Sequence, residues 1–131
     1  MDLIEISREQ VLLKISMLKH MTALNGKWNG RVIADLSVVP IGTGNPSVSK
    51  EVAQVERILA RYPLKINLHS NGTNIEGNWD DICAAIATIH TELHESGIVR
   101  VYCNMRWGSR IDKNQSLESK VEKVKQLLQE Q

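Results

Sequence analysis

Apolar and polar residues alternate along four short segments of the chain, which is the pattern of a half-buried β-strand. The segments are 31–40, 64–70, 73–77 and 98–107. In the first segment, the residues predicted to face the core are Val32, Ala34, Leu36 and Val38. In the second, they are Leu64, Ile66 and Leu68. Asn71 and Gly72 follow the second strand and favour a type I′ hairpin turn, because both of its central positions need a positive φ.

Three helices are predicted from apolar residues that recur at helical spacing. The first begins at Ser47 or Ser49 and carries the stripe Val48, Val52, Val55 and Leu59. The second is capped by Asn78, ends at Gly97 and carries the stripe Ile82, Ile86, Ile89 and Leu93. The third begins at Ser116, and its apolar line is Leu117, Val121, Val124 and Leu128. The other positions of this last helix are mostly charged or amide residues, so it is expected to lie on a surface.

The order of these elements, β-α-β-β-α-β-α, predicts an α+β fold. Right-handed crossovers fold such a chain into a ferredoxin-like βαββαβ sandwich, here with an extra C-terminal helix. Two helices cover one face of the sheet, and the other face stays open. This open face is predicted to carry Ile33, Asp35, Ser37, Val39, Asn67, His69, Ile98, Arg100, Tyr102, Asn104 and Arg106. Its mixture of polar and apolar residues suggests that a ligand or a second copy of the chain covers it.

Residues 1–30 are predicted to form an extension that precedes a ligand-binding domain of residues 31–131. The segment from Ser7 to Gln10 is a capping-box pattern, and apolar residues at helical spacing then predict an amphipathic helix over about 8–20. Residues 25–30 are rich in Gly and Asn and are interpreted as a linker. The fold is therefore expected to survive removal of the extension.

The composition excludes several classes of protein. The 131 residues suit one domain, and 42% hydrophobic with 24% charged residues is typical of a globular chain. The net charge of +1 gives no general attraction to nucleic acid or to an anionic membrane. No apolar run is long enough to span a bilayer. Cys83 and Cys103 are widely separated and are expected to be buried thiols, in a protein of the cytoplasm.

The sequence gives little indication of a metal site or of a catalytic site. His90 and His94 share a helix face, but they flank its apolar stripe, and a zinc site needs three or four ligands. The chain shows no legible Ser-His-Asp or Cys-His arrangement, although the acylphosphatases, which are enzymes, share this strand order. RNA binding on the sheet needs paired aromatic residues, and the open face offers only Tyr102, on an edge strand. The sequence therefore predicts no metal, no cofactor, no nucleic acid partner and no catalytic residue.

Two segments are candidates for ligand contact. Gly42-Thr43-Gly44 joins a strand to a helix, where backbone N–H groups can hold an anion, although such turns are common without any ligand. Glu76 ends a short strand and is followed by Gly77, which lets another molecule approach closely. Its carboxylate is either solvated or positioned to accept hydrogen bonds from a heterocycle.

Several segments together resemble one family, the small thiamine-binding, YkoF-like proteins of ferredoxin-like fold. The segments are VIADLSVVPIGTG, SVSKEVAQVE, LHSNGTNIEGNWDDI and RVYCNMRWGSRIDK, followed by VEKVKQLL. The resemblance covers residues 31–130, and its strongest markers are Val39–Thr43, Gly72–Gly77 and Arg110–Lys113. Asn74 departs from the Thr that is more usual in the family.

The resemblance implies binding of thiamine or its pyrimidine part, a role in thiamine homeostasis, and self-association as dimers that pair into tetramers. Under this reading, Glu76 accepts from the aminopyrimidine, while neutral hydrogen bonds come from Thr43, Thr73 and Asn74. Trp79 or Trp107 stacks on a ring or faces the thiazolium cation. The alternatives are a structural or regulatory homo-oligomer without a dedicated ligand and a small enzyme of acylphosphatase-like fold.

Overall fold

The computed structural model describes residues 7–13 and 27–130 of the chain. Between Arg31 and Leu128, four strands and three helices follow one another in the predicted order. The strands are β1 (Arg31–Ile41), β2 (Lys65–His69), β3 (Gly72–Asn78) and β4 (Arg100–Gly108). The helices are α2 (Ser49–Leu59), α3 (Trp79–Glu95) and α4 (Leu117–Leu128). The strand order β2-β3-β1-β4, with every neighbouring pair antiparallel, confirms the ferredoxin-like fold.

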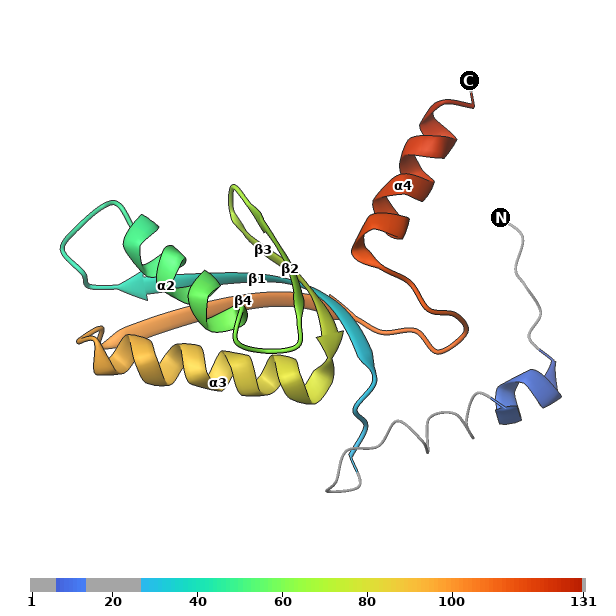
Figure 1. The fold of residues 1–131 in the computed structure, drawn as a ribbon, viewed down its shortest axis with the longest axis horizontal. Helices are drawn as coiled ribbons and strands as arrows, with labels where there is room; N and C mark the ends of the chain where they lie inside the picture. Colours follow the sequence, from blue (N-terminus) through green and yellow to red (C-terminus); the bar gives the residue numbers. More distant parts are fainter. Residues whose placement is uncertain (1–6, 14–26, 131) are drawn as a thin grey trace.

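The core lies between the sheet and the two helices α2 and α3, which pack on the same face of it (Figure 1). Alternate β1 residues point into this core, as the period of two predicts. The buried apolar side chains include Val32, Ala34, Leu36, Val55, Ile58, Leu59, Ile75, Ile82, Ile89 and Leu93. The prediction for Leu68 is wrong, because this residue lies at the end of an edge strand and is 62% exposed. Ile98 also departs from its prediction, because it packs against the core and not on the open face.

The β2–β3 hairpin exists, but its turn is not the predicted one. His69 pairs with Gly72, so the two turn residues are Ser70 and Asn71. Neither Asn71 nor Gly72 has a positive φ, which excludes a type I′ turn. Gly72 is needed for another reason: a Cβ atom on it would lie 2.5 Å from the carbonyl oxygen of Leu36. Close approach to β1, rather than turn geometry, explains this glycine.

The predicted capping residues are confirmed at the start of α4 and just beyond α3, and they are wrong at the start of α2. Ser116 caps α4 as predicted, with its hydroxyl accepting from the Ser119 N–H at 3.0 Å. Neither Ser47 nor Ser49 caps α2, whose N-cap residue is Val48 without a side-chain hydrogen bond. Gly97 has a φ of +100° just beyond α3, as expected for a residue that ends a helix.

The predicted linker contacts the domain at its C-terminal end. The Asn29 carboxamide accepts from the Asp80 N–H at 2.8 Å, and the Gly30 carbonyl accepts from the Trp79 N–H at 3.0 Å. These contacts cap the start of α3, where Asn78 occupies the N-cap position without using its side chain. Trp28 packs against the core. Among residues 27–130, packing against the core therefore begins at Trp28.

Helix α4 stands apart from the two-layer body and projects away from the sheet (Figure 1). Its first residue, Leu117, is buried, but the rest of its predicted apolar line is exposed in the single chain. Val121 and Val124 are 54% and 56% exposed, and Leu128 is 69% exposed. The helix is thus amphipathic, and its apolar side is exposed to solvent in the single chain.

Ser7 and Gln10 form the predicted reciprocal capping box at the start of the helical residues 8–13. Each side chain accepts from the other residue's backbone N–H, at 3.2 Å and 3.0 Å. The remainder of the predicted helix and most of the predicted linker lie outside the described residues.

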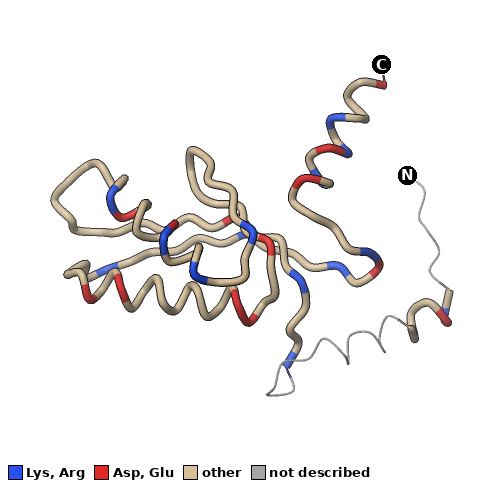
Figure 2. Tube along the Cα trace, in the orientation of Figure 1, with Lys and Arg blue, Asp and Glu red and all other residues tan. Residues whose placement is uncertain are grey.

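Both cysteines are free thiols, but the prediction that both are buried is wrong for Cys83. This residue lies on the exposed side of α3, while Cys103 is half-buried on the core side of β4. Basic and acidic residues are interspersed along the described trace (Figure 2), in keeping with the low net charge. No helix within the described ranges has the length and apolar character needed to cross a membrane.

Candidate functional site

The open face of the sheet meets the first turns of α4, and the two together form a groove. Asn67 and Asn74 are directly paired across β2 and β3, and Asp35 of β1 pairs with Asn74 from the other side. These residues alternate with core residues, so their side chains point away from α2 and α3. Ile33 is the apolar neighbour on β1.

The groove has a volume of about 400 Å³, which is ample for a small heterocyclic molecule. Its apolar lining comes from both the sheet and the helix: Ile33, Leu117 and Val121. Its polar lining is Asn67, Asn74, Glu118, Lys120, Glu122 and Lys125. Two acidic and two basic residues balance one another, so the groove as a whole is neutral. We call this space the sheet–helix groove.

The carboxamides of Asn67 and Asn74 make no hydrogen bond with any residue that the structure describes. Each carboxamide offers two N–H donors and one carbonyl acceptor. A cross-strand pair of such groups lies close together on one face of the sheet. The sheet–helix groove therefore presents several donors and acceptors next to an apolar surface.

Glu76 holds the helical wall of this groove in place. One carboxylate oxygen accepts from the Leu117 N–H of α4 at 2.7 Å, and the other accepts from the Arg31 guanidinium at 2.6 Å. The residue is only 5% exposed. Burial raises the pKa of Glu76, but the hydrogen bonds from Arg31 and Leu117 and the nearby charge of Lys65 outweigh it, so the net pKa is lowered. The group is an anchored carboxylate at a helix N-terminus.

A second ion pair joins the same turn of α4 to the sheet. The Lys65 ammonium of β2 binds the Glu118 carboxylate, and this contact lowers the pKa of Glu118. Both side chains are largely solvent-exposed. The first turn of α4 is thus attached to β3 through Glu76 and to β2 through Lys65.

A polar network lies next to the sheet–helix groove on the open face. Asp35 accepts from Arg106 at 2.9 Å, and its other oxygen lies 2.6 Å from the imidazole Nε2 of His69. The hydrogen bonds with His69 and then Arg106 lower the pKa of Asp35. The network ties β2, β1 and β4 together on the face that carries the groove.

The three tryptophans form a cluster that is separate from the sheet–helix groove. Trp79 and Trp107 stack with ring centroids 4.2 Å apart, and Trp28 stacks on Trp107 at 6.5 Å. Trp107 pairs with Ala34, a core residue, so its ring points toward the helical side of the sheet. The structure brings Trp79 and Trp107 together, as partners of each other and of Trp28.

The two predicted threonines also lie elsewhere. Thr43 is exposed in the β1–α2 loop, where its hydroxyl bonds with the backbone of Asn45. Thr73 is buried on the core side of β3 and its hydroxyl donates to Glu56 of α2. Of the six predicted ligand residues, only Asn74 and Glu76 share the open face beside α4.

Sequence reasoning missed the helical half of the groove. Lys120 and Val121 line it, yet their positions depend on where α4 docks, which no local pattern specifies. Asn67 had been assigned to the open face, but its pairing with Asn74 could not be found, because the predicted turn at Asn71 and Gly72 places His69 opposite Asn74. Arg31 was not a candidate, because its bond to Glu76 crosses between strands.

His90 and His94 have hydrogen-bond partners within the fold. His90 Nε2 lies 3.2 Å from the Cys103 sulfur, and His94 Nδ1 lies 2.7 Å from the Ile98 carbonyl oxygen. Across residues 7–13 and 27–130, no three His, Cys, Asp or Glu side chains gather as a metal-binding group.

Comparison with known proteins now identifies the family. Residues 34–125 match the family model of the thiamine-binding proteins, which is more than half of the chain. The chain belongs to the thiamine-binding protein family. Two curated relatives are UPF0045 proteins: ECM15 of Eremothecium gossypii and YqgV of Bacillus subtilis. ECM15 is 42% identical over 73% of this chain and 91% of its own length. YqgV is 44% identical over 74% of this chain and 97% of its own length.

Solved structures share the fold of this family member. The hypothetical protein MJ1052 of Methanocaldococcus jannaschii superimposes with a TM-score of 0.67 at 30% identity, over 72% of this chain and 96% of its own. A Thermotoga maritima protein, solved as a candidate thiamine biosynthesis or salvage protein, gives a TM-score of 0.62 at 16% identity. That match covers 72% of this chain and 99% of the other and shows likeness of fold.

Proposed function

We propose that this protein binds thiamine or a related pyrimidine in the sheet–helix groove and acts as a binding protein without catalysing a reaction. The observation that carries the proposal is the pair of carboxamides of Asn67 and Asn74, which no described residue hydrogen-bonds, beside the apolar side chains of Ile33 and Val121. Membership of the thiamine-binding family and the name of the Thermotoga relative support the same ligand class.

The chemistry of an aminopyrimidine suits this surface. Its ring nitrogens accept hydrogen bonds and its exocyclic amino group donates them, so a carboxamide can satisfy both at once. Its ring faces are flat and apolar and can pack against Ile33 and Val121. A thiazolium cation linked to the ring would lie near Glu118 or Glu122 on the helix.

Glu76 takes a different role in this proposal from the one that the resemblance implied. Both of its oxygens have partners in the chain, so it positions α4 as the wall of the groove. Glu76 is only 5% exposed, so a ligand could reach its remaining acceptor sites only if Arg31 or α4 moved. Thr43, Thr73, Trp79 and Trp107 would need a second site, because they lie away from the groove.

We include self-association in this proposal. The second candidate function is a homo-oligomer without a dedicated ligand, and the same exposed surfaces favour it. The apolar line of α4 and the open sheet face are exposed in the single chain, and exposed apolar surface of this kind is typical of an interface. A dimer or tetramer would cover these surfaces. A small-molecule binder of this sort is expected in the cytoplasm.

The test is isothermal titration calorimetry of the full chain with thiamine and with its free pyrimidine. The wild type is expected to bind at least one of them, and Asn74→Ala to weaken binding about tenfold or more, the cost of losing hydrogen bonds to a buried polar ligand. The matched control is Asn104→Ala, which removes an exposed carboxamide from β4, on the same sheet face. Absence of binding by the wild type would leave the homo-oligomer as the better account.

A further inference from the structure

A second pocket adjoins the sheet–helix groove, and its charged lining is entirely basic. It has a volume of about 140 Å³ and lies between the start of β1, the β4–α4 loop and α4. Four cationic side chains line it: Arg31, Arg110, Lys113 and Lys120. Among the described residues that line it, none is Asp or Glu. We call it the basic pocket.

Two of the four cations already have a carboxylate partner, and two do not. Arg31 binds Glu76, and Arg110 binds Asp112 through Nε and one Nη, which leaves further N–H donors on its guanidinium. Lys113 and Lys120 have no ion-pair partner among the residues that the structure describes. Two positive charges therefore remain uncompensated beside one another.

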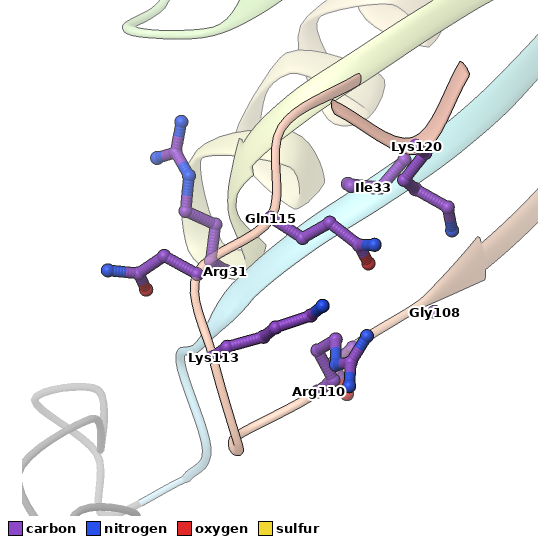
Figure 3. A pocket seen from close by; sticks show the side chains of 9 residues that line it. Arg31, Ile33, Gly108, Arg110, Lys113, Gln115 and Lys120 are labelled. Atoms are coloured by element: carbon purple, nitrogen blue, oxygen red, sulfur yellow. The ribbon is translucent and has the colours of Figure 1, made fainter. Parts of the chain in front are cut away.

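Side chains from the β4–α4 loop and from α4 converge on a common space, whereas Arg31 points away from it and binds Glu76 (Figure 3). Figure 3 shows Lys113 and Gln115 of the loop pointing toward the same region as Lys120 of α4, with Arg110 alongside. These side chains offer only cationic or amide N–H donors, apart from the Gln115 carbonyl. Like charges brought together in this way repel one another unless an anion lies between them.

We infer that the basic pocket binds the phosphate group of a phosphorylated ligand. A phosphate has several acceptor oxygens and carries nearly two negative charges at neutral pH, which matches two unpaired lysines and an adjacent guanidinium. The volume is enough for one such group and bound water.

The basic pocket and the sheet–helix groove are neighbours, because Ile33 and Lys120 line both. A molecule with its ring in the groove could therefore extend a phosphate tail past these two side chains to the pocket. Resting on the proposed function, this proximity makes a thiamine phosphate the preferred ligand over free thiamine. The cationic side chains of the basic pocket would bind the phosphate, and the sheet–helix groove would bind the ring.

The experiment compares thiamine, thiamine monophosphate and inorganic pyrophosphate by calorimetry. We expect the wild type to bind the monophosphate about tenfold or more tightly than thiamine, because charge-assisted hydrogen bonds to phosphate are added. The double variant Arg110→Gln with Lys113→Gln is expected to lose this advantage and leave the affinity for thiamine unchanged, because neither residue lines the sheet–helix groove. The matched control, Lys50→Gln with Arg57→Gln on α2, removes the same charge from exposed positions away from the pocket and is expected to change neither affinity.

The possible results separate this inference from the proposed function. Equal affinity of the wild type for thiamine and its monophosphate, unaffected by the Arg110→Gln, Lys113→Gln double variant, overturns the phosphate site and leaves thiamine binding intact. If neither thiamine compound binds, but pyrophosphate binds to the wild type and not to the double variant, the phosphate site stands and the thiamine proposal fails. If none of the three binds, both are wrong.

Discussion

Glu76 is a buried carboxylate that bonds to β1 and α4 at once, and this dual contact determines what its substitution will do. Glu76→Gln keeps the size of the side chain but removes the charge that Arg31 and the helix N-terminus stabilise. We expect the free energy of unfolding to fall by about 1–3 kcal/mol, the cost of weakening charge-assisted hydrogen bonds to a buried group. Urea denaturation measures this loss.

Glu118→Gln is the control for Glu76, because it breaks an ion pair on the same turn of α4 in which both side chains are largely exposed. Exposed ion pairs contribute little to stability, so its urea midpoint should match that of the wild type. Hydrogen exchange at the first turn of α4 should speed up in Glu76→Gln only. Equal behaviour of the two variants would show that Glu76 does not anchor the helix.

The pH dependence of the same variant follows from the lowered pKa of Glu76. Its folded-state pKa lies below the usual 4.5, so the carboxylate stabilises the fold above that pH, and the contribution is lost as the pH falls through the folded-state pKa. The difference in unfolding free energy between wild type and Glu76→Gln should therefore be complete at neutral pH and shrink in acid. Urea denaturation at several pH values tests the sign: a difference that grows in acid would contradict it.

Residue alternation explains which site residues could be predicted. A period of two places Asn74 and Glu76 on one face of β3 and Thr73 on the other, so the separation of these residues was already contained in the sequence. The stacking of Trp79 on Trp107 was not, because it depends on the register between β1 and β4 and on where α3 begins.

At the scale of elements, the cap of α3 comes from a residue far away in the sequence. Asn29 supplies the hydrogen bond to the Asp80 N–H, and Asn78, at the cap position, does not use its side chain. We expect Asn29→Ala to lower the free energy of unfolding by about 1 kcal/mol and Asn78→Ala to change it less. Thermal unfolding of both variants is the measurement, and the reverse order of effects would refute the assignment.

The strands and the helix starts were predicted to within about two residues, whereas the side chains that cap α2 and α3 were predicted less well. Ser116 caps α4 by local contacts alone, so its sequence pattern suffices. The start of α3 is capped by Asn29 from a segment distant in sequence, and α2 has no side-chain cap. The hairpin was predicted with the wrong turn, because Gly72 serves the approach of β1 rather than a positive φ.

At the scale of the whole molecule, the exposed apolar side of α4 predicts self-association. Sedimentation at micromolar concentration should show a species heavier than the 14.7 kDa chain. Val124→Lys places a charge in the middle of the apolar line and should shift the equilibrium toward the monomer. Lys123→Gln, a change at the neighbouring position, is the control and should leave the assembly unchanged. A wild type that sediments only as a monomer would contradict the prediction.

The most direct test of the account is to locate the ligand on the molecule by ¹H–¹⁵N NMR titration with thiamine and thiamine monophosphate. Backbone and side-chain amides of Asn67, Asn74 and the first turn of α4 are predicted to shift with either ligand. The indole N–H of Trp107 and the backbone amide of Thr43 are predicted to stay in place, because they lie outside the groove. Shifts confined to the tryptophan cluster or the β1–α2 loop, or no shifts at saturating ligand, would contradict the assignment of the sheet–helix groove as the binding site.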